Sequence, residues 1–299
     1  MGKVNLAGNR KLEEMVVTPG GLRPKSNVHL IENGYHINES DGVLKKIHTR
    51  TGTVVKYLGK TNTSKTKTRQ ALRQAASKGK QASLAAGVAA PITNQWIIYS
   101  GWTNDTGSPM TFFSTDWVVP PPPATTNGQL IYLFNGIENA GFNVILQPVL
   151  QWGVSPAGGG NYWAIANWYV GSPQSGLACH SSLVPVNTGD TLRGIMTLTG
   201  QSGSRFDYNS SFEGYNTDLP VTAIEELVWA NETLECYGFK QFSDYPNING
   251  TAMTAIELKT GDTEAVPDWQ AFNNVTDNGQ NCQIISNSSP NGEVDLNYR

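Results

Sequence analysis

The sequence predicts an all-β protein, an antiparallel β-sandwich of two packed sheets resembling concanavalin-type lectins, with a small basic β/helical segment at its N-terminus. From residue 95 onward, short runs of aromatic and β-branched residues follow one another at short intervals. Gly and Pro turn signals separate these runs, and this part of the chain is rich in Gly, Asn, Ser and Thr but poor in charge. Many short strands with such turns are typical of a sandwich.

Individual strands are expected wherever an apolar run is bounded by turn residues. The runs lie at 96–99, 115–119, 130–134, 144–147, 162–170, 191–198, 227–234 and 283–285. The four prolines at 120–123 mark a loop or strand end, because Pro cannot donate a hydrogen bond inside a central strand. The glycines at 158–160 predict a flexible hairpin tip.

The first 90 residues differ from the rest in charge. They hold 16 basic and 5 acidic residues, a net charge of +11, whereas the remaining 209 residues carry −14. Short β-like runs at 28–31 and 52–57 precede a basic, Ala-rich stretch at 66–76, which predicts a marginal helix or a connector. We therefore expect a proregion-like segment at 1–90 and a catalytic-type β-sandwich domain at 91–299.

Opposite charges on the two parts predict that they attract each other at neutral pH. The attraction weakens as carboxylates protonate near pH 4, around the usual Asp and Glu values. We therefore expect the N-terminal segment to be an intramolecular partner that packs on or near the site and loosens in acid.

Several classes of function are disfavoured. The chain has no phosphate loop, zinc motif or dinucleotide fingerprint, so neither a metal nor an organic cofactor is expected. An acidic main part argues against nucleic-acid binding. No apolar run approaches the roughly 20 residues of a membrane span, and we expect a monomer with no membrane partner.

The compartment stays open. The N-terminus lacks the apolar core of a secretory signal peptide, yet the chain contains eight Asn-X-Ser/Thr sequons. Cys179, Cys236 and Cys282 allow at most one disulfide, and buried free thiols are an equal alternative.

The sequence offers few residues for a Ser-His-Asp triad or a Cys-His dyad. Three of the four histidines lie in the basic segment, and the fourth, His180, follows Cys179 directly. Adjacent residues of a strand point to opposite faces, which argues against a Cys–His dyad. Gln and Glu residues within aromatic strands remain as candidates.

Five segments, in order, resemble motifs of the eqolisin family of glutamic peptidases. Residues 134–138 (FNGIE) followed by 145–147 (ILQ) are similar to the family's W-V-G-I-D and I-L-Q. The stretch 162–169 resembles Y-D-A-W-Y-E-W-Y, and 188–190 resembles a G-D turn. The segment 229–235 (WANETLE) resembles W-I-V-E-D-F-E, so the resemblance covers about residues 96–260.

The resemblance implies an acid-acting glutamic endopeptidase with a polypeptide substrate and an extracellular location. Gln147 and Glu232 take the catalytic positions, and Phe134, Glu138 and Trp168 are the expected substrate-binding residues.

The sequence also departs from the family pattern. Phe134 stands for a Trp, Glu138 for an Asp, and Asn167 for a Glu. Nearby carboxylates at Glu225, Glu226 and Glu235 remain alternatives for the base.

The expected chemistry is coherent on elementary grounds. A carboxylate takes a proton from water attacking an amide carbonyl and returns it to the leaving amine. A neutral amide such as Gln147 donates to the developing oxyanion.

A noncatalytic, lectin-like carbohydrate-binding module is the alternative, because eight Trp and many Asn also suit sugar stacking and hydrogen bonding. Gln147 and Gln151 share one face of a strand and are also consistent with solvated sheet positions. Trp163 and Trp168 have opposite parity, so at least one belongs to the core.

Overall fold

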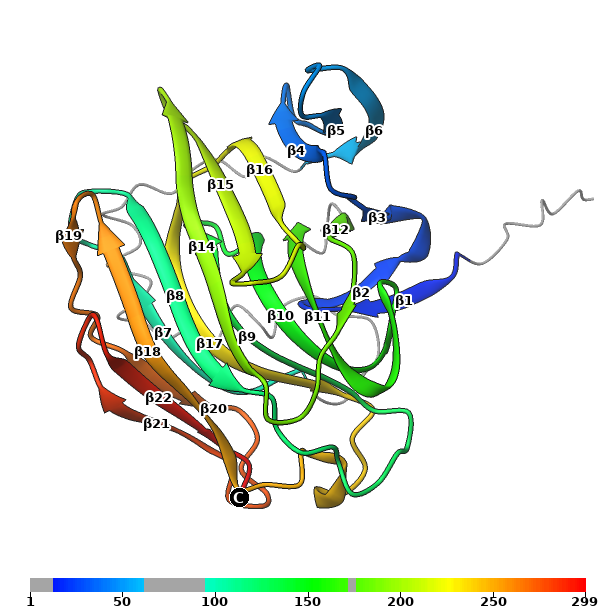
Figure 1. Cartoon of the computed structure of the whole chain (residues 1–299), viewed down its shortest axis with the longest axis vertical. Helices are drawn as coiled ribbons and strands as arrows, with labels where there is room; N and C mark the ends of the chain where they lie inside the picture. Colours follow the sequence, from blue (N-terminus) through cyan, green and yellow to red (C-terminus); the bar gives the residue numbers. More distant parts are fainter. Residues whose placement is uncertain (1–12, 62–94, 172–175) are drawn as a thin grey trace, which may run out of the picture.

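The computed structural model describes residues 13–61, 95–171 and 176–299, whose regular secondary structure is almost entirely β-strand (Figure 1). Two large, mostly antiparallel sheets pack face to face, so the predicted β-sandwich is confirmed. Two short 3₁₀ turns, η1 (Lys25–Asn27) and η3 (Phe242–Asp244), are also present. No helix within these ranges is long and apolar enough to cross a membrane.

The first sheet has nine strands and carries most of the predicted site residues. In spatial order these are β20 (Gln270–Asn273), β7 (Trp96–Thr103), β17 (Leu227–Tyr237), β9 (Leu130–Asn139), β10 (Val144–Ser155), β11 (Gly158–Gly171), β12 (Ala178–His180) and β3 (Val28–Leu30), with β13 (Val184–Pro185) beside β11. The turn that joins β10 to β11 lies at residues 156–157, so the glycines at 158–160, predicted to form the hairpin tip, instead begin strand β11 beside it.

The second sheet has eleven strands and covers one face of the first. Its order is β21 (Asn281–Ser286), β22 (Gly292–Asn297), β18 (Gly250–Thr260), β8 (Met110–Val118), β14 (Thr191–Ser202), β15 (Arg205–Phe212), β16 (Leu219–Ile224), β4 (Tyr35–Ser40), β5 (Val43–His48) and β6 (Val54–Lys60), with β19 (Thr263–Glu264) beside β18. The prolines at 120–123 follow β8 and lie outside the strands, as expected.

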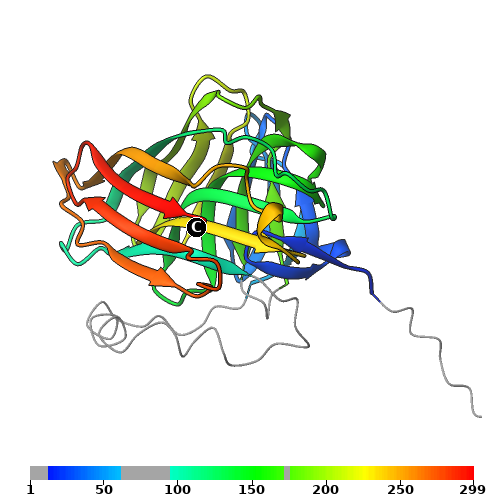
Figure 2. The same ribbon diagram turned by 90° about the horizontal axis from the view of Figure 1, so that it is seen from below.

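Strands of the basic segment extend both sheets. β3 pairs in parallel with β12, and β4 pairs in parallel with β16. β1 (Met15–Thr18) and β2 (Gly21–Pro24) form a separate hairpin, which lies beside the end of β17 (Figure 2). The predicted run at 28–31 thus contains β3, and the run at 52–57 overlaps β6 (Val54–Lys60). The predicted helix at 66–76 and the expected boundary at 90–91 lie outside the described residues.

Each face of the nine-stranded sheet carries a hydrophobic cluster. We call the face packed on the second sheet the inner face and the opposite one the outer face. Trp163 belongs to the main core, whereas Trp168 belongs to a second cluster with Phe134 and Val149. All three cysteines are buried free thiols.

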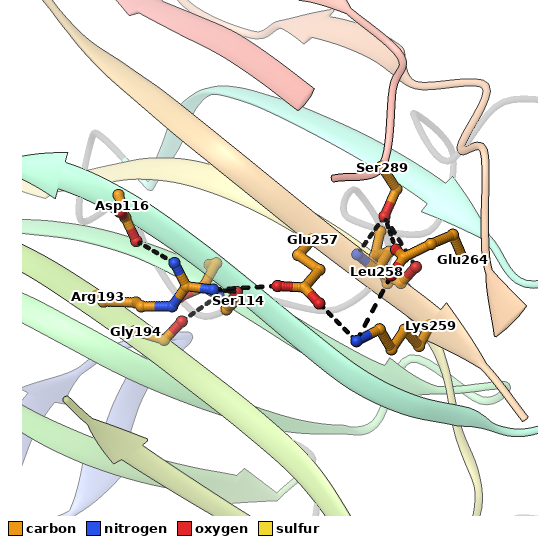
Figure 3. Close-up of polar contacts among 10 residues, drawn as sticks. Ser114, Asp116, Arg193, Gly194, Glu257, Leu258, Lys259, Glu264 and Ser289 are labelled. Carbon is orange, nitrogen blue, oxygen red and sulfur yellow. Dashed lines mark hydrogen bonds and ion pairs between the residues drawn. The ribbon is translucent and has the colours of Figure 1, made fainter. Parts of the chain in front are cut away.

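The exposed side of the eleven-stranded sheet is joined by charged contacts across β14, β8 and β18 (Figure 3). Arg193 donates to Asp116 at 3.3 Å and to Glu257 at 3.1 Å, and it reaches the Ser114 hydroxyl at 2.9 Å. Because strand residues alternate in direction, Thr115 between Ser114 and Asp116 points inward.

Candidate functional site

Glu232 lies on the inner face of the nine-stranded sheet. Its Oε1 accepts a hydrogen bond of 2.6 Å from the Thr115 hydroxyl of β8, in the opposite sheet. Its paired neighbour Asn135 donates to the Gly194 carbonyl of β14 at 3.2 Å. Glu232 is fully buried between the sheets, and burial raises the pKa of its carboxyl well above the usual range despite the opposing Thr115 bond.

Gln147 lies on the outer face. It pairs with Trp168 of β11, and directly paired residues share a face. The preceding residue, Asn167, accepts a bond of 2.7 Å from Ser210 in the opposite sheet and therefore points inward. Trp168 and Gln147 consequently point outward.

The structure does not bring Gln147 and Glu232 together. The β9–β10 pairs on either side, Leu146 with Ile137 and Val149 with Phe134, set Gln147 opposite Gly136. Gly136 pairs with Asn231 of β17, so Asn231, one residue before Glu232, shares the row of Gln147. A one-residue step along a strand moves a side chain to the other face.

The alternative carboxylates also have defined places. Glu225 accepts a 2.7 Å bond from Asn139 at the end of β9. Glu226 directly precedes β17. Glu235 pairs with Tyr132 on the outer face, in the row of Gln151 rather than that of Gln147. Gln151 itself donates to the Gly153 and Gly158 carbonyls of its own hairpin.

Polar atoms around Gln147 lack partners among the described residues. Both side-chain atoms of Gln147, the Nδ2 of Asn231 and the Nε1 of Trp168 are buried without a hydrogen bond. Each such atom costs about 1–3 kcal/mol when no acceptor or donor meets it. Three neutral N–H donors on one face therefore suit a ligand that offers carbonyl or hydroxyl oxygens.

Phe134 and Glu138 flank this row on β9. They are the diagonal neighbours of Gln147 across Gly136, and such residues have Cβ atoms about 7–8 Å apart, within reach of long side chains. The side chains of Asn231 and Ile145 approach closely over Gly136, since a Cβ there would lie 3.1 Å from the Asn231 Oδ1 and from the Ile145 Cδ1. The structure thus places the three expected substrate-binding residues, Phe134, Glu138 and Trp168, on the face of Gln147.

His180 extends the same row beyond Trp168. It pairs with Trp168, their ring centroids lie 4.9 Å apart, and its Nδ1 is 2.8 Å from the Ser181 carbonyl. Burial lowers the pKa of the His180 imidazole. Cys179 pairs instead with Tyr169, so Cys179 and His180 point to opposite faces, as the sequence predicted.

Sequence reasoning missed Asn231 as a neighbour of Gln147. No local signal in the sequence identifies this neighbour, because it follows from the pairing of β9 with β17, which is a long-range property. Within the described ranges, no group of three or more His, Cys, Asp or Glu side chains gathers around a possible metal position.

Comparison with known proteins gives distant structural likenesses. No protein-family model and no curated protein matches the sequence. Two solved structures of scytalido-glutamic peptidase, with transition-state analogues, share 13% and 15% identity, cover 68% and 69% of this chain and 100% and 98% of their own, and give TM-scores of 0.45 and 0.44. SCP-B, a member of the eqolisin family solved with the tripeptide Ala-Ile-His, shares 14% identity over 69% of this chain and all of its own, with a TM-score of 0.43. Likenesses at this level assign neither an activity nor a residue role.

Proposed function

We propose that the protein binds an extended polypeptide on the outer face of the nine-stranded sheet and hydrolyses its peptide bonds in acidic solution. The observation that carries this proposal is the Gln147 amide, fully buried and without a partner, with a carboxylate two residues from the facing Gly136. Gln147 supplies the oxyanion donor, as the family resemblance implies. A base acting on the same water must lie on the same face.

Glu138 is the carboxylate that this geometry favours as the base. It is a diagonal neighbour of Gln147, and only a glycine stands between their strand positions. Its side chain is 7% exposed, which leaves it at the border of the buried cluster. Glu232, the base implied by the resemblance, faces Thr115 and is separated from Gln147 by the sheet.

The reaction proceeds without a covalent enzyme intermediate. The substrate carbonyl oxygen accepts the Gln147 Nε2–H, and Glu138 removes a proton from the water that attacks the carbonyl carbon. The protonated carboxyl then gives this proton to the amide nitrogen, and the C–N bond breaks to release an acid and an amine. One oxyanion donor of this kind contributes about 3–4 kcal/mol of transition-state stabilisation.

The test is cleavage of a denatured protein between pH 2 and 8, with products read by mass spectrometry. Gln147→Ala and Glu138→Gln should each reduce cleavage at least about a hundredfold, the usual contribution of such groups. Glu232→Gln is the matched comparison, because it neutralises a buried carboxylate on the other face. If Glu232→Gln abolished cleavage while Glu138→Gln retained it, Glu232 would be the base, as the family resemblance implies, and the proposed role of Glu138 would be wrong.

A noncatalytic binding module is the second candidate, and a specific observation favours it. The position facing Gln147 across Gly136 is occupied by Asn231, an amide that cannot act as a base. Three neutral donors beside Phe134 and Trp168 suit sugars as well as peptides. If no variant or pH gives cleavage, while glycan or peptide arrays show binding that Gln147→Ala removes, this candidate stands.

A further inference from the structure

The hairpin β1–β2 crosses the outer face of the nine-stranded sheet. The Gly20 amide donates to Glu235 of β17, while a Cβ at Gly20 would lie 3.6 Å from the Val170 Cγ1 of β11. β17 and β11 are separated by β9 and β10 in the sheet, so the sheet curls around the hairpin turn. The Tyr132 hydroxyl of β9 lies 3.5 Å from the Val17 carbonyl, which places the hairpin over the strands between them.

Glu235 is the polar anchor of this contact. Its two carboxylate oxygens lie 2.8 and 3.1 Å from the Gly20 nitrogen, and the Tyr237 hydroxyl donates to the same group. Arg23 on the other strand of the hairpin adds a bond of 2.9 Å to the Gly171 carbonyl at the end of β11. The hairpin is thus tied to both sides of the curled sheet.

Val17 of the hairpin packs against the outer-face cluster that contains Phe134 and Trp168, and the candidate-site residues of this face are closed to solvent. Gln147, Asn231 and Trp168 are fully buried, although their unpaired polar atoms suit an added ligand. A substrate therefore reaches them only after part of the cover moves. The β1–β2 hairpin is a candidate for the part that moves. Its two strands pair only with each other among the described residues, and few hydrogen bonds, such as those of Gly20 and Arg23, hold it to this face.

We propose that residues 15–24 form a strap that occupies the substrate face and is held there by Glu235. This inference rests on the proposed function for the identity of the face. In the closed form the strap excludes polypeptide from Gln147. Weakening the Glu235–Gly20 contact opens the face without altering Gln147 or Glu138.

The test compares hydrogen exchange of the amides in residues 16–22 in full-length wild type and Glu235→Gln. At pH 8, above the pKa of about 7 that burial gives Glu235, the variant replaces a charged acceptor of the Gly20 amide with a neutral one, and the weaker bond should accelerate exchange about tenfold or more. Acrylamide quenching of the Trp168 fluorescence, identified by difference from Trp168→Phe, should rise in parallel. Glu232→Gln, on the same strand but the inner face, should leave exchange of these amides unchanged.

Gly20→Ala disturbs the same contact from the side of the strap. Gly20 has φ of +85°, a conformation that an L side chain adopts only with strain, so this variant should also speed exchange. Unchanged exchange and quenching in both variants would overturn the strap. Both readouts work without substrate, so an opened strap with no cleavage at any pH counts against the proposed hydrolysis and not against the strap.

Discussion

Glu232 is a carboxylic acid enclosed in the middle of the sandwich. One oxygen is bound by Thr115, and the other has no partner among the described residues. Burial raises its pKa well above the usual value, so the folded protein holds it in the neutral form. In the unfolded chain it ionises near pH 4.3. Glu232 therefore links the stability of the fold to pH.

The linkage predicts the behaviour of Glu232→Gln. Because the folded pKa is raised, the stability associated with the neutral acid is fully present below about pH 4.3 and declines as pH rises toward the folded value, by about 1.4 kcal/mol per unit. Urea unfolding at pH 4 should give similar free energies for wild type and variant. At pH 7 the variant should be the more stable. An equal difference at both pH values would contradict this account.

The sequence motifs indicate which strands carry the candidate site, but not always which residues of a strand point to its face of the sheet. Gln147 and Glu138 follow from the order of short motifs, and both lie on the outer face. Glu232 and Asn231 are adjacent in one motif, and the sequence alone does not say which of them points outward. The pairing of β17 with β9 decides this, and it is a long-range property.

At the scale of elements, the packing of β7 beside β17 requires a residue without a side chain at Gly101. A Cβ at Gly101 would lie 2.1 Å from the Trp229 ring, which also packs on Trp96 with ring centroids 6.1 Å apart. Gly101→Ala should therefore lower the free energy of unfolding by about 1–3 kcal/mol through overpacking. The measurement is chemical denaturation. In a Trp229→Leu background the same substitution should cost much less, and an equal cost in both backgrounds would show that the ring is not the cause.

β9 has a comparable requirement within the proposed site. A Cβ at Gly136 would lie 3.1 Å from both the Asn231 Oδ1 and the Ile145 Cδ1, between the two β9 positions that are proposed to contact substrate. Gly136→Ala should reduce cleavage about tenfold by displacing the reacting groups by tenths of an ångström, with little change in melting temperature. Gly200→Ala, in β14 of the other sheet, is the matched control and should leave cleavage unchanged. Full activity in Gly136→Ala would show that cleavage does not depend on the absence of a side chain at this position.

Most long strands of the nine-stranded sheet were predictable, because they carry runs of aromatic and β-branched residues. In the eleven-stranded sheet, β15, β16, β18 and β22 were not predicted, because polar residues and Gly interrupt their apolar residues or the apolar run is short. The placement of the N-terminal strands was not predictable either. β3 and β4 join the sheets through parallel pairs with β12 and β16, separated from them by well over a hundred residues. No local pattern encodes such a partner, and parallel pairs lack the turn signal of a hairpin.

At the scale of the whole molecule, two electrostatic effects of opposite sign act on the fold. Attraction between the first 90 residues, at +11, and the rest, at −14, weakens in acid. Buried carboxyls act the other way, since burial raises the pKa of Glu235 to about 7 and that of Glu232 well above the usual range. The first effect is long-ranged and screened beyond about 10 Å at 0.1 M salt, whereas the second is local and persists.

Added salt screens the long-range attraction, so at high salt the pH dependence of stability should reflect mainly the buried carboxyls. For Glu235 alone, a folded pKa of about 7 against about 4.3 unfolded corresponds to stability on the order of 4 kcal/mol, present below pH 4.3 and mostly lost by pH 7. At 0.3 M salt, wild type should lose stability between pH 4.5 and 7.5 relative to a double variant, Glu232→Gln with Glu235→Gln, that lacks both groups. Urea denaturation of the two proteins at both pH values measures this difference. A relative gain for wild type over the same interval would mean that these carboxyls are ionised in the folded protein, contrary to the raised pKa values that burial gives them.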